Sequence, residues 1–365
     1  MKKRITSFLL LTAMLALILT NLTGCFGRGN GNADVHVFYY TYSDPYISSV
    51  RSALDKRLDE AGVSYQDYDS NNSQTTQTEQ VQTAITKGAK LIVVNIVTTG
   101  SDDAAAGIIS LAKEKGVPVI FFNREVSDEV VNSYEKCVFI GTDAAEAGYL
   151  QGDMIGDYLN ENFDRVDLNG DGEISYVMFM GEKGNNEAIY RTMYSVENAD
   201  KKLTEAGRAP LKFYDASNRD KYLLDRDGKW SAQAANEYMT TLLTSYNKTN
   251  NNMVELVICN NDNMAEGAIT ALTAAGYNTG NEGATSVPVF GVDATDAAKS
   301  LIKSGRMTGT VKQDAEGMAD ALRLAIDSGS AGESLTSKLK DYTIDEDVAK
   351  VRINYSAYFG EEENK

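Results

Sequence analysis

Short apolar runs alternate with longer amphipathic segments along most of the chain. The apolar runs are rich in Val, Ile and Phe, as strands buried on both faces are, whereas the segments between them repeat apolar residues every three or four positions, as helices do. The pattern predicts strands over Val35–Tyr40, Val63–Tyr68, Lys90–Val97, Val117–Phe122, Val138–Gly141, Ile174–Met180, Leu211–Asp215, Val254–Cys259 and Val287–Val292. It predicts helices over Pro45–Ala61, Thr75–Lys87, Asp102–Lys115, Ala144–Asn162, Glu187–Ala206, Ser231–Tyr246 and Ala265–Ala275.

This alternation predicts an α/β fold with parallel sheets covered on both faces. The strand–helix series runs once up to Gly141 and restarts at Ile174, which predicts two similar doubly wound lobes. We expect three connecting strands between them, a three-strand hinge, near Gly141–Asp143, Val311–Ala315 and Ile344–Ala349. The expected N-terminal lobe comprises residues 34–142 and 314–345, and the expected C-terminal lobe comprises residues 143–313 and 346–360.

The first residues have the order of a secretory signal. Basic Lys2-Lys3-Arg4 precedes an apolar run from Phe8 to Leu19, and Leu22-Thr23-Gly24-Cys25 follows. Small residues before a cysteine at the end of the apolar core are typical of a lipobox, with cleavage before Cys25 and a lipid attached to its sulfur. Residues 1–24 are therefore predicted to be a signal peptide and residues 25–33 a flexible, lipidated tether. The alternative is an ordinary signal with a chance cysteine. Either reading predicts an extracytoplasmic protein, and the lipid would anchor it to the membrane.

Composition narrows the possible partners. The 365 residues are 42% hydrophobic and carry a net charge of −17, so the chain can bury two cores but would repel nucleic acid. No second apolar run approaches membrane-spanning length. Cys137 and Cys259 lie in apolar runs and are expected to be packed thiols, with a disulfide between them as the alternative.

Polar side chains follow the predicted strands. In open parallel sheets, ligands bind beyond the carboxyl ends of the strands, so these positions matter most. They carry Asp44, Tyr46, Asn123, Arg124, Asn185, Glu187, Arg191, Asn260, Asn261, Asp262 and Asp293, with Trp230 nearby in the chain. Each alone is explained equally well as a helix cap. Five strand ends in two lobes instead favour a shared cleft, in which carboxylates, amides and a guanidinium suit sugar hydroxyls and aromatic rings suit a sugar face.

The sequence carries no catalytic constellation. It has no Gly-x-Ser-x-Gly elbow, no His-Glu-x-x-His and no Walker loop, and its one histidine, His36, lies in the first predicted strand. Paired carboxylates are too common among 52 acidic residues to indicate a glycosidase. We therefore expect a binding protein and not an enzyme.

The segment Asp167–Ser175 matches the first nine positions of a calcium loop. It places oxygen side chains at Asp167, Asn169, Asp171 and Ser175, a glycine at position six, and the backbone carbonyl of Glu173 at position seven. The glutamate expected at position twelve is Met178. The loop alone therefore leaves calcium binding and a metal-free turn both open.

Several motifs carry a family resemblance over nearly the whole chain. They are Tyr40-Thr41-Tyr42-Ser43-Asp44, Phe121-Phe122-Asn123-Arg124-Glu125, Gly141-Thr142-Asp143, the calcium loop, Asn260-Asn261-Asp262-Asn263-Met264-Ala265, Pro288-Val289-Phe290-Gly291-Val292-Asp293 and Lys303-Ser304-Gly305. With them the chain resembles the galactose/glucose-binding branch of the periplasmic binding proteins, the solute receptors of ABC importers. The resemblance implies a type I periplasmic binding protein fold that closes on a hexose by hinge motion and delivers it to a membrane permease.

The resemblance also implies site residues. The sugar contacts carry over to Asp44, Tyr46, Asn123, Asn185, Glu187, Arg191, Trp230, Asn261, Asp293 and Gln313. Tyr46 stands for a phenylalanine, Asn185 for a histidine, Glu187 for an aspartate and Gln313 for an asparagine, so the ranking of glucose, galactose and related sugars does not follow. For structural Ca²⁺, the resemblance implies Glu255 as the missing carboxylate, while Ser175 is shorter than the family's glutamine.

Two other functions stay open at this point. One is a lipid-anchored enzyme acting on sugars. The other is a sensor subunit that presents its sugar signal to a chemoreceptor or signalling receptor in addition to, or in place of, an importer. A repressor with the same fold is excluded by the lipobox and by the lack of an N-terminal DNA-binding helix pair. We expect a monomer.

Overall fold

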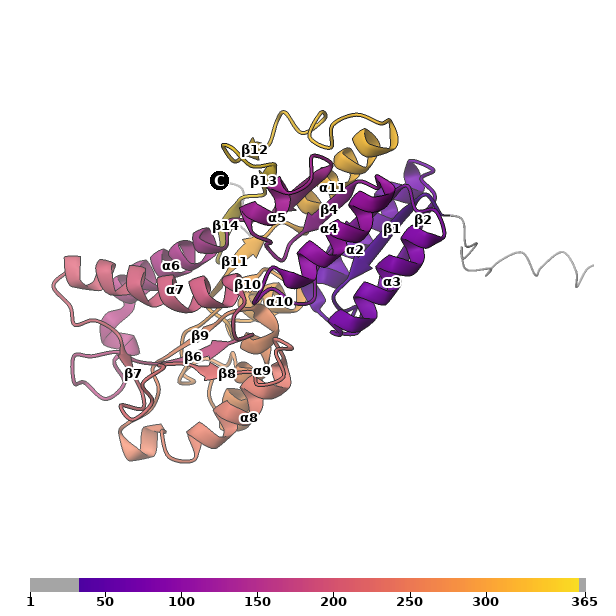
Figure 1. Cartoon of the computed structure of the whole chain (residues 1–365). Coiled ribbons are helices and arrows are strands. Elements are labelled where there is room, and N and C mark those ends of the chain that lie inside the picture. Colours follow the sequence, from indigo (N-terminus) through magenta and orange to yellow (C-terminus); the bar gives the residue numbers. More distant parts are fainter. Residues whose placement is uncertain (1–32, 361–365) are drawn as a thin grey trace, which may run out of the picture.

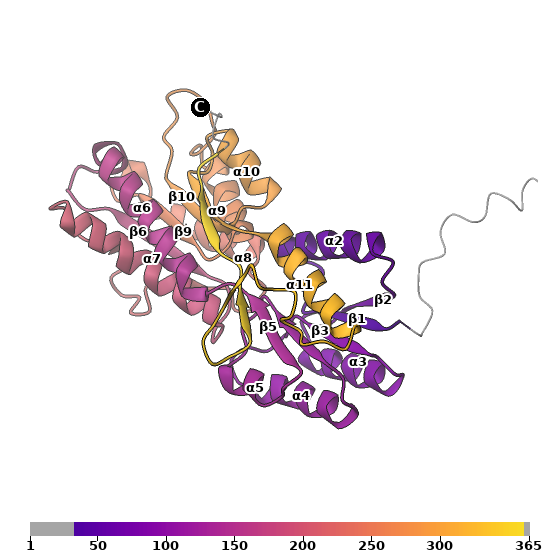
Figure 2. The same ribbon diagram turned by 90° about the horizontal axis from the view of Figure 1, so that it is seen from above.

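A computed structural model describes residues 33–360, which form two α/β lobes (Figures 1 and 2). The predicted signal peptide, residues 1–24, and Cys25 with most of the tether lie outside the described residues. Across residues 33–360, none of the helices has the length and apolar composition that a bilayer span requires.

The N-terminal lobe is built on a seven-stranded sheet. In spatial order its strands are β12 (Thr343–Ile344), β13 (Lys350–Arg352), β5 (Cys137–Gly141), β4 (Val119–Phe122), β3 (Leu91–Val94), β1 (Val35–Tyr39) and β2 (Tyr65–Asp69). All neighbours are parallel except β12 and β13. The parallel alternation predicted from the sequence is therefore confirmed in this lobe.

The C-terminal lobe repeats the plan. Its strands are, in order, β14 (Tyr355–Tyr358), β11 (Gly309–Gln313), β10 (Val289–Asp293), β9 (Leu256–Cys259), β6 (Ser175–Met180) and β7 (Lys212–Phe213), with β8 (Leu223–Leu224) also paired to β6. Only β14 runs antiparallel to its neighbour.

Helices cover both faces of each sheet. They are α2 (Pro45–Glu60), α3 (Gln74–Thr86), α4 (Asp103–Lys115), α5 (Asp128–Asn132), α6 (Ala144–Val166), α7 (Asn186–Glu205), α8 (Ala232–Leu243), α9 (Asp262–Ala274), α10 (Asp296–Lys303) and α11 (Ala315–Ser330), with a short 3-10 turn at Lys248–Asn250. In the N-terminal lobe, α2 and α11 pack on one face of the sheet and α3, α4 and α5 on the other. In the C-terminal lobe, α6 and α7 cover one face and α8, α9 and α10 the other.

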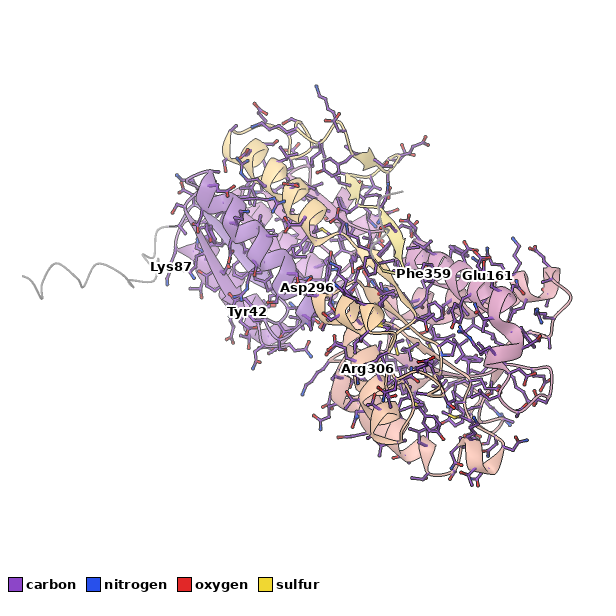
Figure 3. The ribbon with its side chains drawn as sticks, turned by 180° about the vertical axis from the view of Figure 1, so that it is seen from behind. Tyr42, Lys87, Glu161, Asp296, Arg306 and Phe359 are labelled. Carbon is purple, nitrogen blue, oxygen red and sulfur yellow. The ribbon has the colours of Figure 1, made fainter. Side chains whose placement is uncertain are left out.

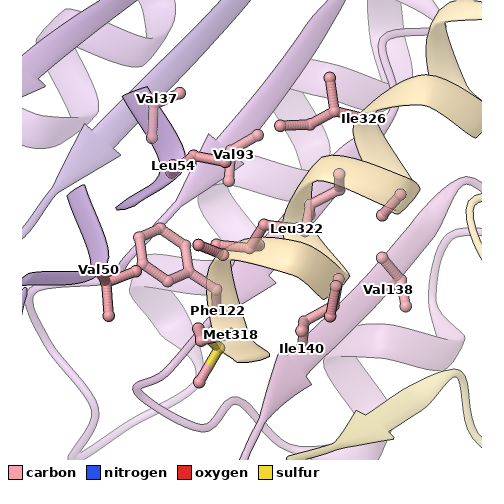
Figure 4. Packing of buried hydrophobic residues seen from close by; sticks show 14 of the residues in the cluster. Val37, Val50, Leu54, Val93, Phe122, Val138, Ile140, Met318, Leu322 and Ile326 are labelled. Atoms are coloured by element: carbon pink, nitrogen blue, oxygen red, sulfur yellow. The ribbon is translucent and has the colours of Figure 1, made fainter. Parts of the chain in front are cut away.

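The buried strands hold each lobe together. Residues such as Val93 and Phe122 meet Leu54 of α2 and Leu322 of α11 in one apolar layer (Figure 4). Because β3, β4 and β9 are buried on both faces, each reads as a continuous apolar run in the sequence. Cys137 and Cys259 are free and buried in the two lobes, so they are packed thiols as expected.

Within residues 33–360, the chain crosses between the lobes three times. The first crossing joins β5 to α6 after Gly141, and the second joins β11 to α11 after Gln313, both close to their expected places. The third is the yellow segment 353–354, which joins β13 to β14 (Figure 2).

The expected third crossing at Ile344–Ala349 needs correction. Residues 346–352 belong to the N-terminal lobe, because β12 and β13 extend its sheet and buried Lys350 forms ion pairs with Glu125 and Asp128 there. The chain re-enters the C-terminal lobe only at β14.

Candidate functional site

A cavity lies between the lobes at the carboxyl ends of their strands. Its lining residues are Tyr40, Asp44, Tyr46, Ile47, Asn123, Arg124, Asn185, Glu187, Arg191, Trp230, Asn261, Asp293 and Gln313. All ten side chains that the sequence and the resemblance placed in a sugar site are among them. The structure therefore brings the ten together at one cavity.

Helix α2 positions the first wall. Asp44 caps this helix, because its Oδ1 accepts the Ile47 amide N–H at 2.8 Å, while its Oδ2 accepts the Tyr40 hydroxyl at 2.7 Å. Tyr46, in the first helical turn, is buried and faces the cavity. The helix-cap reading of Asp44 is thus correct, and the same carboxylate also lines the cavity.

Asn123 and Arg124 follow β4 and form the second wall. Asn123 has a left-handed backbone, with φ 62°, and its Oδ1 accepts a hydrogen bond from Asn95 Nδ2 at 3.1 Å. The guanidinium of Arg124 lies over the Tyr40 ring, 4.4 Å from its centre. These contacts hold two polar side chains toward the opposite lobe.

Helix α7 contributes the polar centre of the C-terminal lobe. Asn185 caps the helix, and Glu187 and Arg191 lie on its cavity side. Arg191 Nη1 donates to the Asn260 carbonyl at 2.9 Å, and Nη2 donates to the Tyr355 hydroxyl at 3.0 Å. The guanidinium is therefore held from two strands and has little freedom to turn away.

Two further residues of the C-terminal lobe have a strained backbone at the cavity. Trp230 has φ 53° and Asp293 has φ 125°, which are unusual for residues with a side chain and cluster at functional sites. The Trp230 ring fits against Gly181, where a Cβ atom would lie 2.2 Å from the ring. Only glycine permits this contact, so the close approach fixes the tryptophan at the cavity.

Polar atoms without a protein partner collect at this cavity. Among the described residues, five such buried atoms belong to lining side chains: Tyr46 Oη, Arg124 Nη1, Glu187 Oε2, Arg191 Nε and Gln313 Nε2. An unpaired buried polar group costs about 1–3 kcal/mol. A ligand that supplies several hydroxyls would remove this cost, because each hydroxyl can donate once and accept twice.

The carboxylates are poorly solvated. Burial raises the pKa of Glu187, and the charges of Arg191 and Arg124 oppose the rise. Burial likewise raises the pKa of Asp293, with Arg191 opposing. Hydroxyl donors from a ligand would favour the charged carboxylates, so the electrostatics suit a neutral, hydrogen-bonding molecule.

Four residues at the cavity or between the lobes are missing from the sugar contacts that the sequence predicts. Tyr40, Ile47 and Arg124 line the cavity, and Glu182 forms an ion pair with Arg124 that joins the two lobes directly. Glu182 Oε2 also accepts the indole N–H of Trp230 at 3.3 Å. Arg124 and Glu182 both follow predicted strands, so their positions were a usable signal, but the sequence does not show that they face each other.

The predicted calcium loop has a defined shape. Glu255 reaches it as the resemblance implies: Oε1 accepts the Leu168 amide N–H at 2.8 Å, and Oε2 accepts the Ser175 amide and hydroxyl at 2.9 and 3.0 Å. Asp167 accepts amide N–H groups of the loop glycines at 2.7 and 2.9 Å. The atoms that would coordinate the ion are all oxygens, which Ca²⁺ prefers, so the residue set fits this ion.

One observation weighs against a fully formed metal site. Over residues 33–360, no group of three or more His, Cys, Asp and Glu side chains lies close enough to hold a metal. Asp167, Asp171 and Glu255 would have to draw together around the ion, and calcium binding therefore stays a prediction.

Comparisons with known proteins agree with this geometry. Residues 35–328 match the family model of the periplasmic binding protein domain. The chain is 32% identical over 330 residues to the D-galactose/methyl-galactoside binding periplasmic protein MglB of Haemophilus influenzae, covering 90% of both. Its fold resembles an ABC transporter solute binding protein from Bacillus halodurans with bound myo-inositol, with TM-score 0.67, 24% identity and coverage of 90% and 95%. It also resembles one from Clostridium phytofermentans with bound β-D-glucose, with TM-score 0.67, 20% identity and coverage of 89% and 93%. The chain belongs to the periplasmic binding protein family, whose members bind substrates for transport and are not enzymes.

Proposed function

We propose that the protein is an extracytoplasmic solute-binding protein that captures a hexose and delivers it to an ABC importer. The observation that carries the proposal is the set of five unpartnered polar atoms in a cavity that both lobes build. Both lobes contribute aromatic rings, Tyr40 and Tyr46 from one and Trp230 from the other, and acidic and amide side chains line the same cavity. The likeness to MglB, which its name describes as a galactose and methyl-galactoside binder, supports a hexose.

Capture follows from the two-lobe construction. A sugar that contacts Asp44 of one lobe and Asp293 of the other stabilises only the closed arrangement, so it shifts the lobes toward closure by its differential contacts. The importer would recognise that closed form. The lipid on Cys25 keeps the receptor near the membrane, and Ca²⁺ in the loop with Glu255 supplies structural stability.

Specificity among hexoses rests on three side chains. All three are buried at the cavity: Asn185, Glu187 and Gln313. Each differs in length from the residue that the galactose/glucose-binding branch has at the same position. A hydroxyl that leaves one of them unpaired would cost about 1–3 kcal/mol. The preferred epimer is therefore decided by these positions.

Calorimetry with a sugar panel tests the proposal. We expect D-galactose or D-glucose to bind one per chain, with weaker binding of ribose and myo-inositol, and the sugar to be recovered unchanged. Failure of every hexose to bind, together with tight binding of a pentose or an inositol, would overturn the hexose assignment.

A further inference from the structure

A second cavity adjoins the proposed hexose cavity between the lobes. It is lined by α2, by α10 and by the β11–α11 crossing, and it shares Tyr46, Asp293 and Gln313 with the hexose cavity. Asp296 of α10, one of its lining residues, is labelled where the two lobes meet (Figure 3). Its volume is about 530 Å³. We call it the side cavity.

Two unpartnered atoms stand at the boundary between the cavities. Tyr46 is 5% exposed and Gln313 is 3% exposed, and neither Tyr46 Oη nor Gln313 Nε2 has a hydrogen-bond partner in the protein. Both residues line both cavities. A ligand that reaches from one cavity into the other would bond to these two atoms and remove the cost of leaving them unpaired.

The side cavity is hydroxyl-rich. Ser48, Ser49 and Ser52 of α2 line one side, and Thr295 lines the other. Hydroxyls both donate and accept, so they match the hydroxyls of a second sugar ring in either direction.

The charged side chains of the side cavity largely offset one another. Lys299 pairs with Asp296 at 3.6 Å, and Lys312 pairs with Asp314 at 3.7 Å. The whole lining carries three lysines and four carboxylates, so the side cavity offers little net attraction to an ionic substituent. A neutral, hydroxylated group fits better than a phosphate or an amine.

We propose that the protein binds a disaccharide, with one hexose between Tyr46 and Trp230 and the second sugar ring in the side cavity. The inference rests on the proposed hexose function and extends its substrate class. Sites for small organic ligands commonly measure about 300–1,000 Å³, so 530 Å³ leaves room for a second ring. Tyr46 Oη and Gln313 Nε2 would then bond to oxygens near the glycosidic link.

Blocking the side cavity without touching the hexose cavity tests this inference. Ser52→Trp fills the side cavity from an exposed position of α2, and Ser110→Trp makes the same change on exposed α4 as the matched control. Calorimetry would use D-galactose, D-glucose, lactose, melibiose, maltose and cellobiose. We expect at least one disaccharide to bind within tenfold of the better hexose. Ser52→Trp should weaken that disaccharide at least tenfold and leave the hexose unchanged, whereas Ser110→Trp should change neither.

The outcomes separate the two proposals. Hexose binding with no disaccharide binding, or equal effects of Ser52→Trp on both ligands, overturns the side-cavity inference and leaves the hexose function standing. If the unaltered protein binds no hexose, the hexose function itself is overturned. Lys56→Trp, at another exposed position that lines the side cavity, serves as the second blocking variant if Ser52→Trp lowers the unfolding midpoint.

Discussion

Removing the charge of Glu182 should weaken sugar binding, because Glu182 joins the two lobes and also accepts hydrogen bonds from the cavity residues Trp230 and Asn185. Glu182 belongs to the C-terminal lobe and forms an ion pair with Arg124 of the N-terminal lobe, so hinge opening should break this pair. The Arg124 side chain is 5% exposed and the Glu182 side chain is 22% exposed, so water screens the pair only partly. Glu182→Gln keeps the size of the side chain and removes its charge.

The magnitude follows from this burial. Breaking a fully buried ion pair costs about 3–5 kcal/mol, and a hydrogen bond to a charged group contributes about 1.5–3 kcal/mol. Because Glu182 is partly exposed and glutamine can still accept a bond, we take the lower range, roughly 1.5–3 kcal/mol. That loss falls on the closed state alone and should raise the Kd for hexose roughly 10- to 150-fold.

Calorimetry measures the change, and a matched variant controls for it. Asp157→Asn removes a carboxylate charge that pairs with Lys202 at 2.7 Å within the C-terminal lobe, so closure does not alter that pair. We expect its hexose affinity to stay within twofold of the unaltered protein. If Glu182→Gln also binds hexose within twofold, while small-angle scattering still shows compaction, the lobes are not held by this pair and the reasoning is refuted.

Three further predictions concern stability. Burial, reinforced by Asp55, raises the pKa of Asp67 to about 8, so the folded protein holds this proton while the unfolded chain releases it near pH 4. As the pH rises from about 4 to about 8, the unfolding free energy should therefore fall by up to about 1.4 kcal/mol per pH unit. Urea titrations at several pH values should show that Asp67→Asn flattens this slope. Calcium at 100 times its Kd should stabilise the protein by about 2.7 kcal/mol, and Glu255→Gln should abolish the difference between calcium and EDTA in thermal melts; equal melting of the unaltered protein in both would exclude the ion. Gly152→Ala should cost about 1–3 kcal/mol, because the new Cβ would lie 2.7 Å from Asn198 Cβ of α7, whereas Gly107→Ala in α4 meets nothing within 4 Å and should stabilise by about 0.5–1 kcal/mol.

The strand ends explain how much of the site could be predicted. Asp44, Asn123 and Asp293 follow buried apolar strands, and parallel sheets bring such positions to one edge, so their shared location follows from the pattern alone. Trp230 and Gln313 were placed by family resemblance, because Trp230 lies in a loop and no apolar run marked β11. The side cavity depends on how α2 and α10 face each other across the lobes, which no local pattern encodes.

The fold was predictable where the apolar runs were strong. The third crossing was misplaced because β12 and β13 are short, and their pairing depends on long-range contacts such as Lys350 with Glu125. The sequence pattern does not predict helices α10 and α11, although α11 supplies much of the N-terminal core from a distant part of the chain. Elements that return to a lobe after an excursion through the other one are hard to place from sequence alone.

The fluorescence of Trp230 tests the central claim most directly. Trp230 is the sole tryptophan of the chain, and its ring lies at the cavity between the lobes. Titration with the hexose that binds in calorimetry should change its emission saturably, with one site per chain and the same Kd. Calorimetric binding of a hexose that leaves the emission of Trp230 unchanged would contradict the placement of the sugar against this ring.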